Sequence, residues 1–278
     1  MSQQTASVTE IARDYYDSED ADNFYAAIWG GEDIHIGLYD DRRSIKEASR
    51  ETVLHMARRL RGLKPGARVL DIGSGYGGAA RVLAGDFGAD VTCLNLSEKE
   101  NDRNRALTKE QGLADKITVV EGSFEDIPAE DAEFDIVWSQ DAILHAGDRR
   151  KVLDEVARVL KKGGEFIFTD PMQADTLTDA SVLQPIYDRI HLSSLASFAF
   201  YRRELEGRGF REIAIEDFTG QLRNHYSRVK AELADRRGQL EGEISAGYID
   251  RMLTGLQHWV DGADNGHLAW GVMHFEKA

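Results

Sequence analysis

The sequence predicts an α/β fold built on a doubly wound, mostly parallel seven-stranded sheet, and two observations carry this prediction. Between residues 68 and 170, short apolar runs alternate with segments of helical spacing. Runs as apolar as these are typical of parallel strands that are covered on both faces. A glycine-rich turn also follows the first apolar run and opens the first helical segment. Strands and helices that alternate in this way form βαβ units, and therefore a doubly wound sheet.

The individual elements follow from two periodicities, close to two residues for strands and close to 3.6 residues for helices. Strands are expected at Arg68–Ile72, Asp90–Leu96, Ile117–Glu121, Phe134–Ser139, Glu165–Asp170, Arg211–Phe218 and Leu268–Glu276. Helices between the first five strands are expected at Gly78–Phe87, Glu98–Gln111 and Arg149–Leu160. Gly163 and Gly164 follow the last of these helices, so we expect them to lie in the loop where the chain leaves it.

Additions to the sheet are expected on both sides of this core. An aromatic-rich segment at 23–37 and an amphipathic stretch at 44–61 indicate an N-terminal helical lid. Two helical stretches near 223–238 and 246–260 form an insertion before the last strand, which must lie outside the sheet. We therefore expect a lid at 1–62, a ligand-binding core at 63–172, and substrate cap helices with the last two strands at 173–278.

Composition narrows the class of protein. The chain has 278 residues, of which 42% are hydrophobic, enough to bury a full core. It has neither an apolar run of 18 residues nor the features of a signal peptide at its start, so we expect a soluble cytoplasmic protein. Its single cysteine, Cys93, lies in an apolar run and is expected to be a buried strand residue. The formal net charge of −15 would repel nucleic acids and anionic membranes, and this favours a small-molecule substrate.

The glycine-rich turn is the first candidate binding site. Gly73, Gly75 and Gly78 satisfy the Gly-x-Gly-x-x-Gly pattern, which brings backbone amides and a helix N-terminus close to a ligand. The pattern alone fits either a dinucleotide or S-adenosylmethionine (SAM). Asp71 precedes the loop by two residues, where its carboxylate would attract the cationic methionine end of SAM and repel a pyrophosphate.

Four motifs carry a family resemblance. Val69-Leu-Asp-Ile-Gly-x-Gly-x-Gly, the run at 119–128, Phe134-Asp-Ile-Val-Trp138 and Leu160-Lys-Lys-Gly-Gly164 occur in the order found in class I SAM-dependent methyltransferases, which the chain resembles. The resemblance implies a Rossmann-like SAM methyltransferase fold with SAM as cofactor. The cofactor-binding residues that it and the loop point to are Ile34, His35, Asp71, Gly73, Ser74, Gly75, Asn95, Leu96, Glu100, Ser123, Phe124 and Gln140.

Several of these positions leave alternatives open. The second strand usually ends in an acidic residue that binds the ribose, and here that position is Asn95. Glu100, one helical turn further on, either supplies the missing carboxylate or is solvated. Ser123 and Phe124 take the position that contacts adenine, where aspartate is common. His35 either closes over the methionine carboxylate or is a packed structural histidine.

The segment Ser139-Gln-Asp-Ala-Ile-Leu-His145 is expected to carry the chemistry, because it follows the fourth strand at the ligand-binding edge. It resembles a stretch of the phosphoethanolamine methyltransferases in which the histidine pairs with a tyrosine of the lid, here Tyr25. Gln140 replaces an arginine of that family. This replacement removes an anchor for a phosphate or carboxylate, so it disfavours a phosphobase substrate.

A longer resemblance covers nearly the whole chain. The segments at 20–25, 29–37, 138–141, 168–173 and 267–271 are similar to those of the sarcosine/dimethylglycine N-methyltransferases, which make the osmolyte glycine betaine. The resemblance implies that His145, Tyr25 and Asp141 are catalytic. The amine has to be neutral to react, so His145 would accept its proton. Tyr25, Trp29 and Asp141 would face the quaternary ammonium of the product.

The remaining expectations concern the acceptor and the assembly. Tyr25 and Trp29 are expected to bind substrate, and the partner of its carboxylate is left open among Arg189, Arg223, Asn224, His225 and Tyr226. For Arg189 and for Arg223, the alternative is a solvated surface charge. The alternative functions are a phosphoethanolamine-type or other small-amine methyltransferase and a non-catalytic SAM-binding scaffold. We expect no metal requirement, a small-molecule amine or amino-acid substrate, no nucleic-acid or membrane partner, and a monomer or homodimer.

The charge composition generates a prediction about salt. Acidic residues outnumber basic ones, and only 10 of the 34 basic residues are lysine, a pattern typical of halophilic proteins. We expect the melting temperature and the activity to persist or rise between about 0.1 M and about 1 M potassium chloride, because the Debye length falls from ~10 Å to ~3 Å and screens the repulsion. Thermal unfolding across this range checks the prediction, and a steady fall in melting temperature would contradict it.

Overall fold

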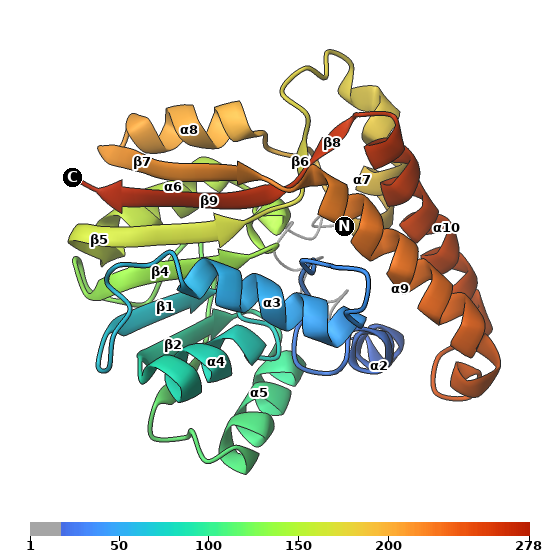
Figure 1. The fold of residues 1–278 in the computed structure, drawn as a ribbon, viewed down its shortest axis with the longest axis horizontal. Helices are drawn as coiled ribbons and strands as arrows, with labels where there is room; N and C mark the ends of the chain where they lie inside the picture. The colour runs from blue at the N-terminus through green and yellow to red at the C-terminus, as the bar shows by residue number, and fades with distance from the viewer. Residues whose placement is uncertain (1–17) are drawn as a thin grey trace, which may run out of the picture.

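The computed structural model describes residues 18–278, and their core is one mixed sheet (Figure 1). Residues 1–17, which include the chain start and the first part of the expected lid, lie outside the described residues. Within the described range the sheet has seven strands in the order β3-β2-β1-β4-β5-β9-β7. These are β1 (Arg68–Ile72), β2 (Asp90–Asn95), β3 (Ile117–Glu121), β4 (Phe134–Gln140), β5 (Leu160–Thr169), β7 (Phe210–Asp217) and β9 (Gly271–Lys277). The first five pair in parallel and β9 pairs antiparallel to both neighbours, which confirms the predicted fold class.

Two stretches differ from the predicted elements. Gly163 and Gly164 lie inside β5 rather than in a loop, because the strand begins at Leu160 and its register with β4 shifts at this point. Gly163 has φ +76°, a conformation that glycine adopts without steric cost, so the strand continues through an irregular step. The expected last strand is divided at Trp270. Before it, β8 (Leu268–Ala269) pairs with β6 (Met172–Gln173) outside the main sheet.

Helices cover both faces of the sheet because its side chains alternate between two apolar clusters. Leu70 and Ile72 of β1 belong to the cluster that α6 (Arg149–Val159) and α8 (Phe198–Glu206) complete. Val69 and the buried Cys93 belong to the opposite cluster. That cluster is completed by α3 (Ile45–Ala57) and α4 (Gly78–Phe87), while α5 (Glu98–Glu110) lies against β2 and β3. The sheet is therefore buried on both faces, as its apolar strands predict.

The lid and the cap pack on each other beside the sheet. The lid contains α2 (Glu19–Ile28), a helix that the sequence analysis did not assign, followed by α3. The cap contains η2 (Ala180–Leu183), α7 (Gln184–Ile190), α9 (Thr219–Leu240) and α10 (Ala246–Asp264), and the last two are longer than expected. Figure 1 shows α9 and α10 side by side beyond the sheet, and aromatic residues of α2 belong to an apolar cluster with residues of both helices. No helix within residues 18–278 is both long and apolar enough to cross a membrane.

A buried carboxylate joins the end of the lid to the sheet. Glu165 of β5 is 3% exposed and accepts hydrogen bonds from the backbone N–H of Gly62 at 2.6 Å and of Arg61 at 3.2 Å. His274 Nε2 of β9 lies 2.9 Å from the same carboxylate. Burial raises the pKa of Glu165, but these hydrogen bonds outweigh it and lower the pKa to about 2.

We expect Glu165→Ala to lower the free energy of unfolding by roughly 2–4 kcal/mol, because it leaves buried donors without an acceptor. The folded-state pKa lies below the ordinary value of 4.5, so the carboxylate stabilises the fold fully above about pH 4.5 and loses this effect as the pH falls towards 2. Urea unfolding of both proteins at pH 7 and at pH 4 checks this, since the difference should shrink at the lower pH. An equal difference at both would show that the charge is irrelevant.

Candidate active site

A cavity lies at the carboxyl ends of β1, β2 and β4, between the glycine loop and the lid. The twelve residues predicted to bind the cofactor all line it, namely Ile34, His35, Asp71, Gly73, Ser74, Gly75, Asn95, Leu96, Glu100, Ser123, Phe124 and Gln140. Asp141 and His145, predicted to be catalytic, line it as well. Sequence reasoning missed Glu32, Asp33, Ala79, Ser97, Gly122, Glu125 and Ala142. The one signal in the sequence that could have identified them is that they lie close to predicted site residues along the chain.

The glycine loop has the form that a close-fitting cofactor site needs. Gly73 has φ +74°, and a Cβ at this position would lie 2.3 Å from Cβ of Ala142. Gly77 has φ +75° and is the N-cap of α4. The backbone N–H of Gly73 donates to the carbonyl of Leu94 at 2.8 Å, which ties the loop to the end of β2. Side chains at these positions would be strained or would clash, so the loop requires glycine.

The lid contacts this loop through Gly78. The backbone N–H of Gly78 donates to the carbonyl of Glu32 at 3.0 Å. A Cβ on Gly78 would lie 2.4 Å from that carbonyl oxygen and 2.2 Å from Oδ1 of Asp33. The third glycine of the motif is therefore needed for the lid to close on the loop, a role that the sequence alone did not indicate.

Apart from Nε2 of His35, three buried polar atoms of the first cavity have no hydrogen-bond partner in the part of the chain that the structure describes. They are Asp71 Oδ2, Ser74 Oγ and Gln140 Nε2. Burial raises the pKa of Asp71 to about 7, and a bound cation would favour its ionised form. An acceptor of this kind beside two donors matches the ammonium and carboxylate groups of an amino acid. The residues present therefore fit the methionine end of SAM.

The opposite end of the cavity suits a ribose. Asn95 Nδ2 donates to Oε2 of Glu100 at 2.8 Å, and Glu100 is buried rather than solvated. The pair presents an amide oxygen and a carboxylate, both acceptors for hydroxyl groups. Of the two alternatives left open for Glu100, the structure therefore favours a substitute for the missing acidic residue.

His35 is buried at the edge of the same cavity, so the two alternatives stated for it are not exclusive. Its Nε2 lies 3.3 Å from Oδ1 of Asp33, and its Nδ1 lies 3.2 Å from the carbonyl oxygen of Ile36. Burial lowers the pKa of His35, but the carboxylates of Asp33 and Asp141 outweigh it and raise the pKa overall. A histidine with a raised pKa can provide positive charge next to a bound carboxylate.

A second, smaller cavity adjoins the first and shares Ile34, Asp141 and His145 with it. Its other lining residues are Tyr25, Trp29, Ile36, Leu144, Pro171, Arg189, Ile190, His225, Tyr226 and Trp259. Five residues predicted to bind substrate are among them. Trp259 was not predicted because nothing in the sequence of α10 shows that this helix reaches the site; its ring stacks on that of Tyr226, with centroids 4.8 Å apart.

Two predicted substrate residues, Arg223 and Asn224, do not line this cavity. Both are exposed, and Arg223 Nε donates to Oδ1 of Asp264 at 3.0 Å. The reason is the helical turn of about 100° per residue, which directs Leu222 and His225 of α9 inwards and the two residues between them outwards. Arg223 is thus a surface charge, as one of the two alternatives held.

Gln140, which was predicted to bind the cofactor, does not line the second cavity. It lines the first cavity, where its Oε1 accepts a hydrogen bond from Trp138 Nε1 at 3.1 Å. The arginine that it replaces in the phosphoethanolamine methyltransferases was interpreted as an anchor for the acceptor. A side chain at this position lines the cavity that fits SAM and not the second cavity. The replacement of the arginine by Gln140 therefore does not by itself exclude a phosphobase substrate.

Asp141 lies where the two cavities meet, at the end of β4. Its Oδ2 accepts the backbone N–H of Ile36 in the lid at 2.7 Å, and its Oδ1 accepts Trp270 Nε1 at 2.8 Å. Burial raises the pKa of Asp141 against the effect of these hydrogen bonds. Its backbone has φ +52°, which is uncommon for a residue with a side chain. The carboxylate therefore holds the lid to the core beside the reaction centre.

His145 ends the short 3₁₀ helix η1 (Ile143–His145) and lines both cavities, and Tyr25 lines the second with it. Burial, with a smaller effect from the positive charge of Arg149, lowers the pKa of His145 to about 4. A pKa near the ordinary histidine value was expected for a proton acceptor. His145 is instead neutral at pH 7 and is a weak base.

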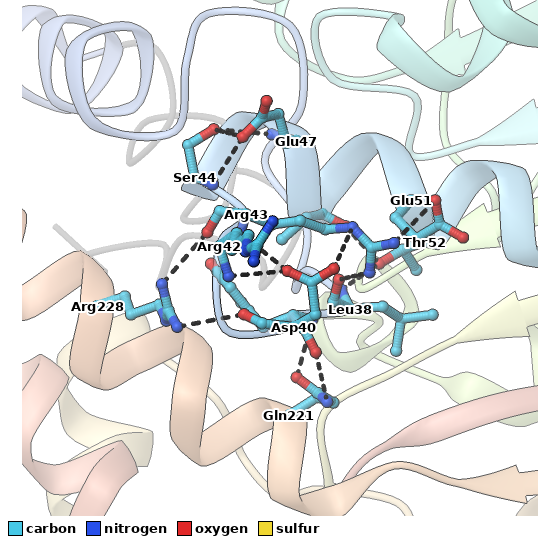
Figure 2. A network of polar contacts seen from close by, with 12 residues as sticks. Leu38, Asp40, Arg42, Arg43, Ser44, Glu47, Glu51, Thr52, Gln221 and Arg228 are labelled. Atoms are coloured by element: carbon cyan, nitrogen blue, oxygen red, sulfur yellow. Dashed lines mark hydrogen bonds and ion pairs between the residues drawn. The ribbon is translucent and has the colours of Figure 1, made fainter.

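One face of α9 fixes the segment of the lid that lies between α2 and α3. Gln221 exchanges two hydrogen bonds with the backbone of Tyr39, and Arg228 donates to the carbonyls of Asp40 and Arg43 (Figure 2). His225 lies between them on this face and accepts the backbone N–H of Gly37 at Nδ1. Because residues four and three apart share a helix face, these three side chains hold the segment as a unit.

The fold, the glycine loop and the unpartnered polar atoms together describe a SAM site, and comparison with known proteins agrees. Residues 70–168 match a family model described as a methyltransferase domain. The chain is therefore a class I SAM-dependent methyltransferase. Among residues 18–278, no group of three or more histidine, cysteine or acidic side chains is arranged to hold a metal ion.

Full-length relatives define the family more narrowly. The sarcosine/dimethylglycine N-methyltransferase of Halorhodospira halochloris is 57% identical over 269 residues, covering 96% of each chain. The protein of the same name from Aphanothece halophytica is 50% identical, covering 97% of this chain and 98% of that one. A crystal structure of a candidate sarcosine dimethylglycine methyltransferase from Galdieria sulphuraria has a TM-score of 0.90 at 44% identity, covering 95% and 99%. The chain belongs to the sarcosine/dimethylglycine N-methyltransferase family and is a SAM-dependent N-methyltransferase.

We expect Gly78→Ala to weaken SAM binding by about 10- to 100-fold while the protein stays folded, because the added methyl group prevents the lid from closing at a cost of ~1–3 kcal/mol. Isothermal titration with SAM measures the affinity. Gly238→Ala is the matched control, since its Cβ would have no neighbour within 4 Å in the described structure. Equal SAM affinity in Gly78→Ala and wild type would show that closure does not need this glycine.

Proposed function

We propose that this enzyme transfers the methyl group of SAM to the nitrogen of sarcosine and of dimethylglycine, and so makes glycine betaine. The observation that carries the proposal is the meeting of two cavities at Ile34, Asp141 and His145. One cavity fits the amino-acid end of SAM. The other is small, aromatic and closed by the lid, as an acceptor of a few heavy atoms requires. Relatives that span the whole chain carry this activity in their names.

The walls of the second cavity support a methylated ammonium group. Tyr226 stacks on Trp259, and the rings of Tyr25 and Trp29 lie 5.1 Å apart. Aromatic faces attract an organic cation, and the carboxylate of Asp141 adds a full negative charge. Both contacts strengthen as the nitrogen becomes cationic during transfer, so they stabilise the transition state more than the neutral amine.

SAM, when bound, supplies a methyl group attached to a positively charged sulfur. This sulfur is a leaving group that needs no assistance from an acid or a metal. The contribution of this chain is to orient the amine and exclude water. Sarcosine and dimethylglycine each lose one proton before the nitrogen lone pair can form the new C–N bond. Each turnover therefore releases one proton, and the second product is a quaternary ammonium that retains no N–H.

His145 is suited to binding the neutral form of the amine. Its low pKa keeps the imidazole neutral throughout the neutral and alkaline range. It can accept a hydrogen bond from the N–H that neutral sarcosine retains, while a full proton transfer from an ammonium ion to so weak a base is unfavourable. Tyr25, across the same cavity, completes the aromatic contact around the nitrogen.

The same cavity disfavours a phosphobase acceptor. Arg189 is the permanent cation among its described lining residues, and His145 and His225 have lowered pKa values that keep them neutral. A phosphate with two negative charges would find less compensation there than a carboxylate with one. Independence of metal, a cytoplasmic location and a monomeric or homodimeric state stay predictions from the sequence.

We expect His145→Ala to lower kcat with sarcosine by about 10²-fold, the lower end for a lost acid–base group, with a smaller loss for dimethylglycine, whose neutral amine has no N–H to donate. SAM affinity should change little. Initial rates with both acceptors between about pH 6.5 and about pH 10, with Tyr25→Phe in parallel, test this. Equal losses that are rescued as the pH rises would instead make His145 the proton acceptor. No loss with either acceptor would remove His145 from the mechanism.

A further inference from the structure

The buried N–H groups of the second cavity that have no acceptor within residues 18–278 include two on aromatic rings. These two are Nε1 of Trp29 and Nε2 of His225, whose side chains are 5% and 0% exposed. Both side chains line this cavity, and their ring centroids lie 5.2 Å apart. A buried donor without an acceptor destabilises a fold, so two of them in one cavity indicate a ligand that brings acceptor atoms.

The lid determines which nitrogen of His225 carries the hydrogen. The backbone N–H of Gly37 lies 3.2 Å from Nδ1, and the hydroxyl of Tyr39 lies 2.7 Å from the same atom. Because a backbone N–H can only donate, Nδ1 is the acceptor. Burial, with a smaller effect from His35, lowers the pKa of His225 to about 3, so the ring is neutral. A neutral ring that accepts at Nδ1 carries its hydrogen on Nε2.

We propose that Trp29 Nε1–H and His225 Nε2–H together bind the carboxylate of the methyl acceptor. This assignment rests on the proposed function, because it places the carboxylate of sarcosine and dimethylglycine. One carboxylate has an oxygen for each donor. Its other end is then directed to the shared boundary of the two cavities, where His145 and Asp141 lie. Since the lid orients His225, the carboxylate site is complete only when the lid is closed.

Arg189 is the rival anchor, and its packing argues for a supporting role. Its Nη2 donates to Sδ of Met252 at 2.9 Å. Its side chain lies against α10 so closely that a Cβ at Gly255 would come within 2.0 Å of its Cδ. In this position the guanidinium balances the charge of the closed cavity, while the two neutral donors make the contacts. Arg189→Met separates the two roles.

Matched substitutions test the donors one atom at a time. Trp29→Phe removes the N–H and keeps an aromatic ring. His225→Asn keeps an amide near the position of Nδ1 but loses the donor, whereas the longer His225→Gln places an amide donor near the position of Nε2. We expect KM for dimethylglycine to rise about 10- to 100-fold in Trp29→Phe and His225→Asn, with most of the loss restored in His225→Gln. The value of kcat and the SAM affinity should change much less.

An acceptor without a carboxylate is the control for each variant. N,N-dimethylethanolamine has a hydroxymethyl group in its place, so its KM should be high in wild type and should not rise further in Trp29→Phe or His225→Asn. Calorimetric titration of glycine betaine into the complex with S-adenosylhomocysteine gives a readout independent of turnover, and the two variants should bind it more weakly by the same factor. Thermal unfolding shows which variants fold; if His225→Asn does not, Trp29→Phe and His225→Gln carry the test.

The outcomes distinguish this inference from the proposed function. If the wild-type enzyme methylates neither sarcosine nor dimethylglycine, the proposed function fails. If it methylates them but the folded Trp29→Phe and His225→Asn keep their KM for dimethylglycine, the carboxylate assignment fails alone. A large rise in KM confined to Arg189→Met would overturn it in favour of the arginine. A rise that is equal for the acceptor without a carboxylate would show that the substitutions only disturb packing.

Discussion

The carboxylate of Asp141 is the interaction on which the rest of the site depends. Its left-handed backbone, φ +52°, costs on the order of 1 kcal/mol or more and persists only where the surroundings enforce it. Here both oxygens are used, one by the lid through Ile36 and one by the indole of Trp270 at the start of the last strand. One partly buried side chain at the end of β4 thus joins three parts of the chain that are more than 100 residues apart. The lid, the sheet and the C-terminal segment are therefore placed relative to one another at the point where the two cavities meet.

It follows that the cofactor site and the acceptor site form together. The short segment 32–37 contacts the glycine loop through Glu32, lines both cavities through Ile34, and reaches Asp141 and His225 through Ile36 and Gly37. A lid displaced from the loop would also lose its contacts with α9. Coupling of this kind excludes water before the amine meets the sulfonium, which favours methyl transfer over side reactions. It also means that product leaves only when all of these contacts open.

The parts of this arrangement that depend on local pattern could be predicted from the sequence, and those that depend on tertiary contact could not. The strands of the core follow from apolar periodicity and the loop follows from its glycine spacing, so apart from the start of β5 they agree with the structure to within a few residues. Gly163 and Gly164 were assigned to a loop because a bulge inside a strand depends on its neighbour. Arg223 and Asn224 were grouped with His225 by adjacency, although a helix directs them outwards. The contribution of Trp259 depends on how α10 folds back, and no motif records that.

The chemistry of the proposed acceptor explains why neutral N–H donors would recognise its carboxylate in so acidic a protein. A glycine derivative is a zwitterion, so the field of a chain with net charge −15 exerts little net force on it. In the proposed site, selection therefore comes from groups close enough to distinguish its two ends, with buried N–H donors at the carboxylate and aromatic faces with Asp141 at the nitrogen. Salt screens exposed charges over distances of ~10 Å or less but affects buried contacts much less. A site built from such contacts keeps its affinity at ionic strengths that weaken surface ion pairs, which is the condition in which a cell makes an osmolyte.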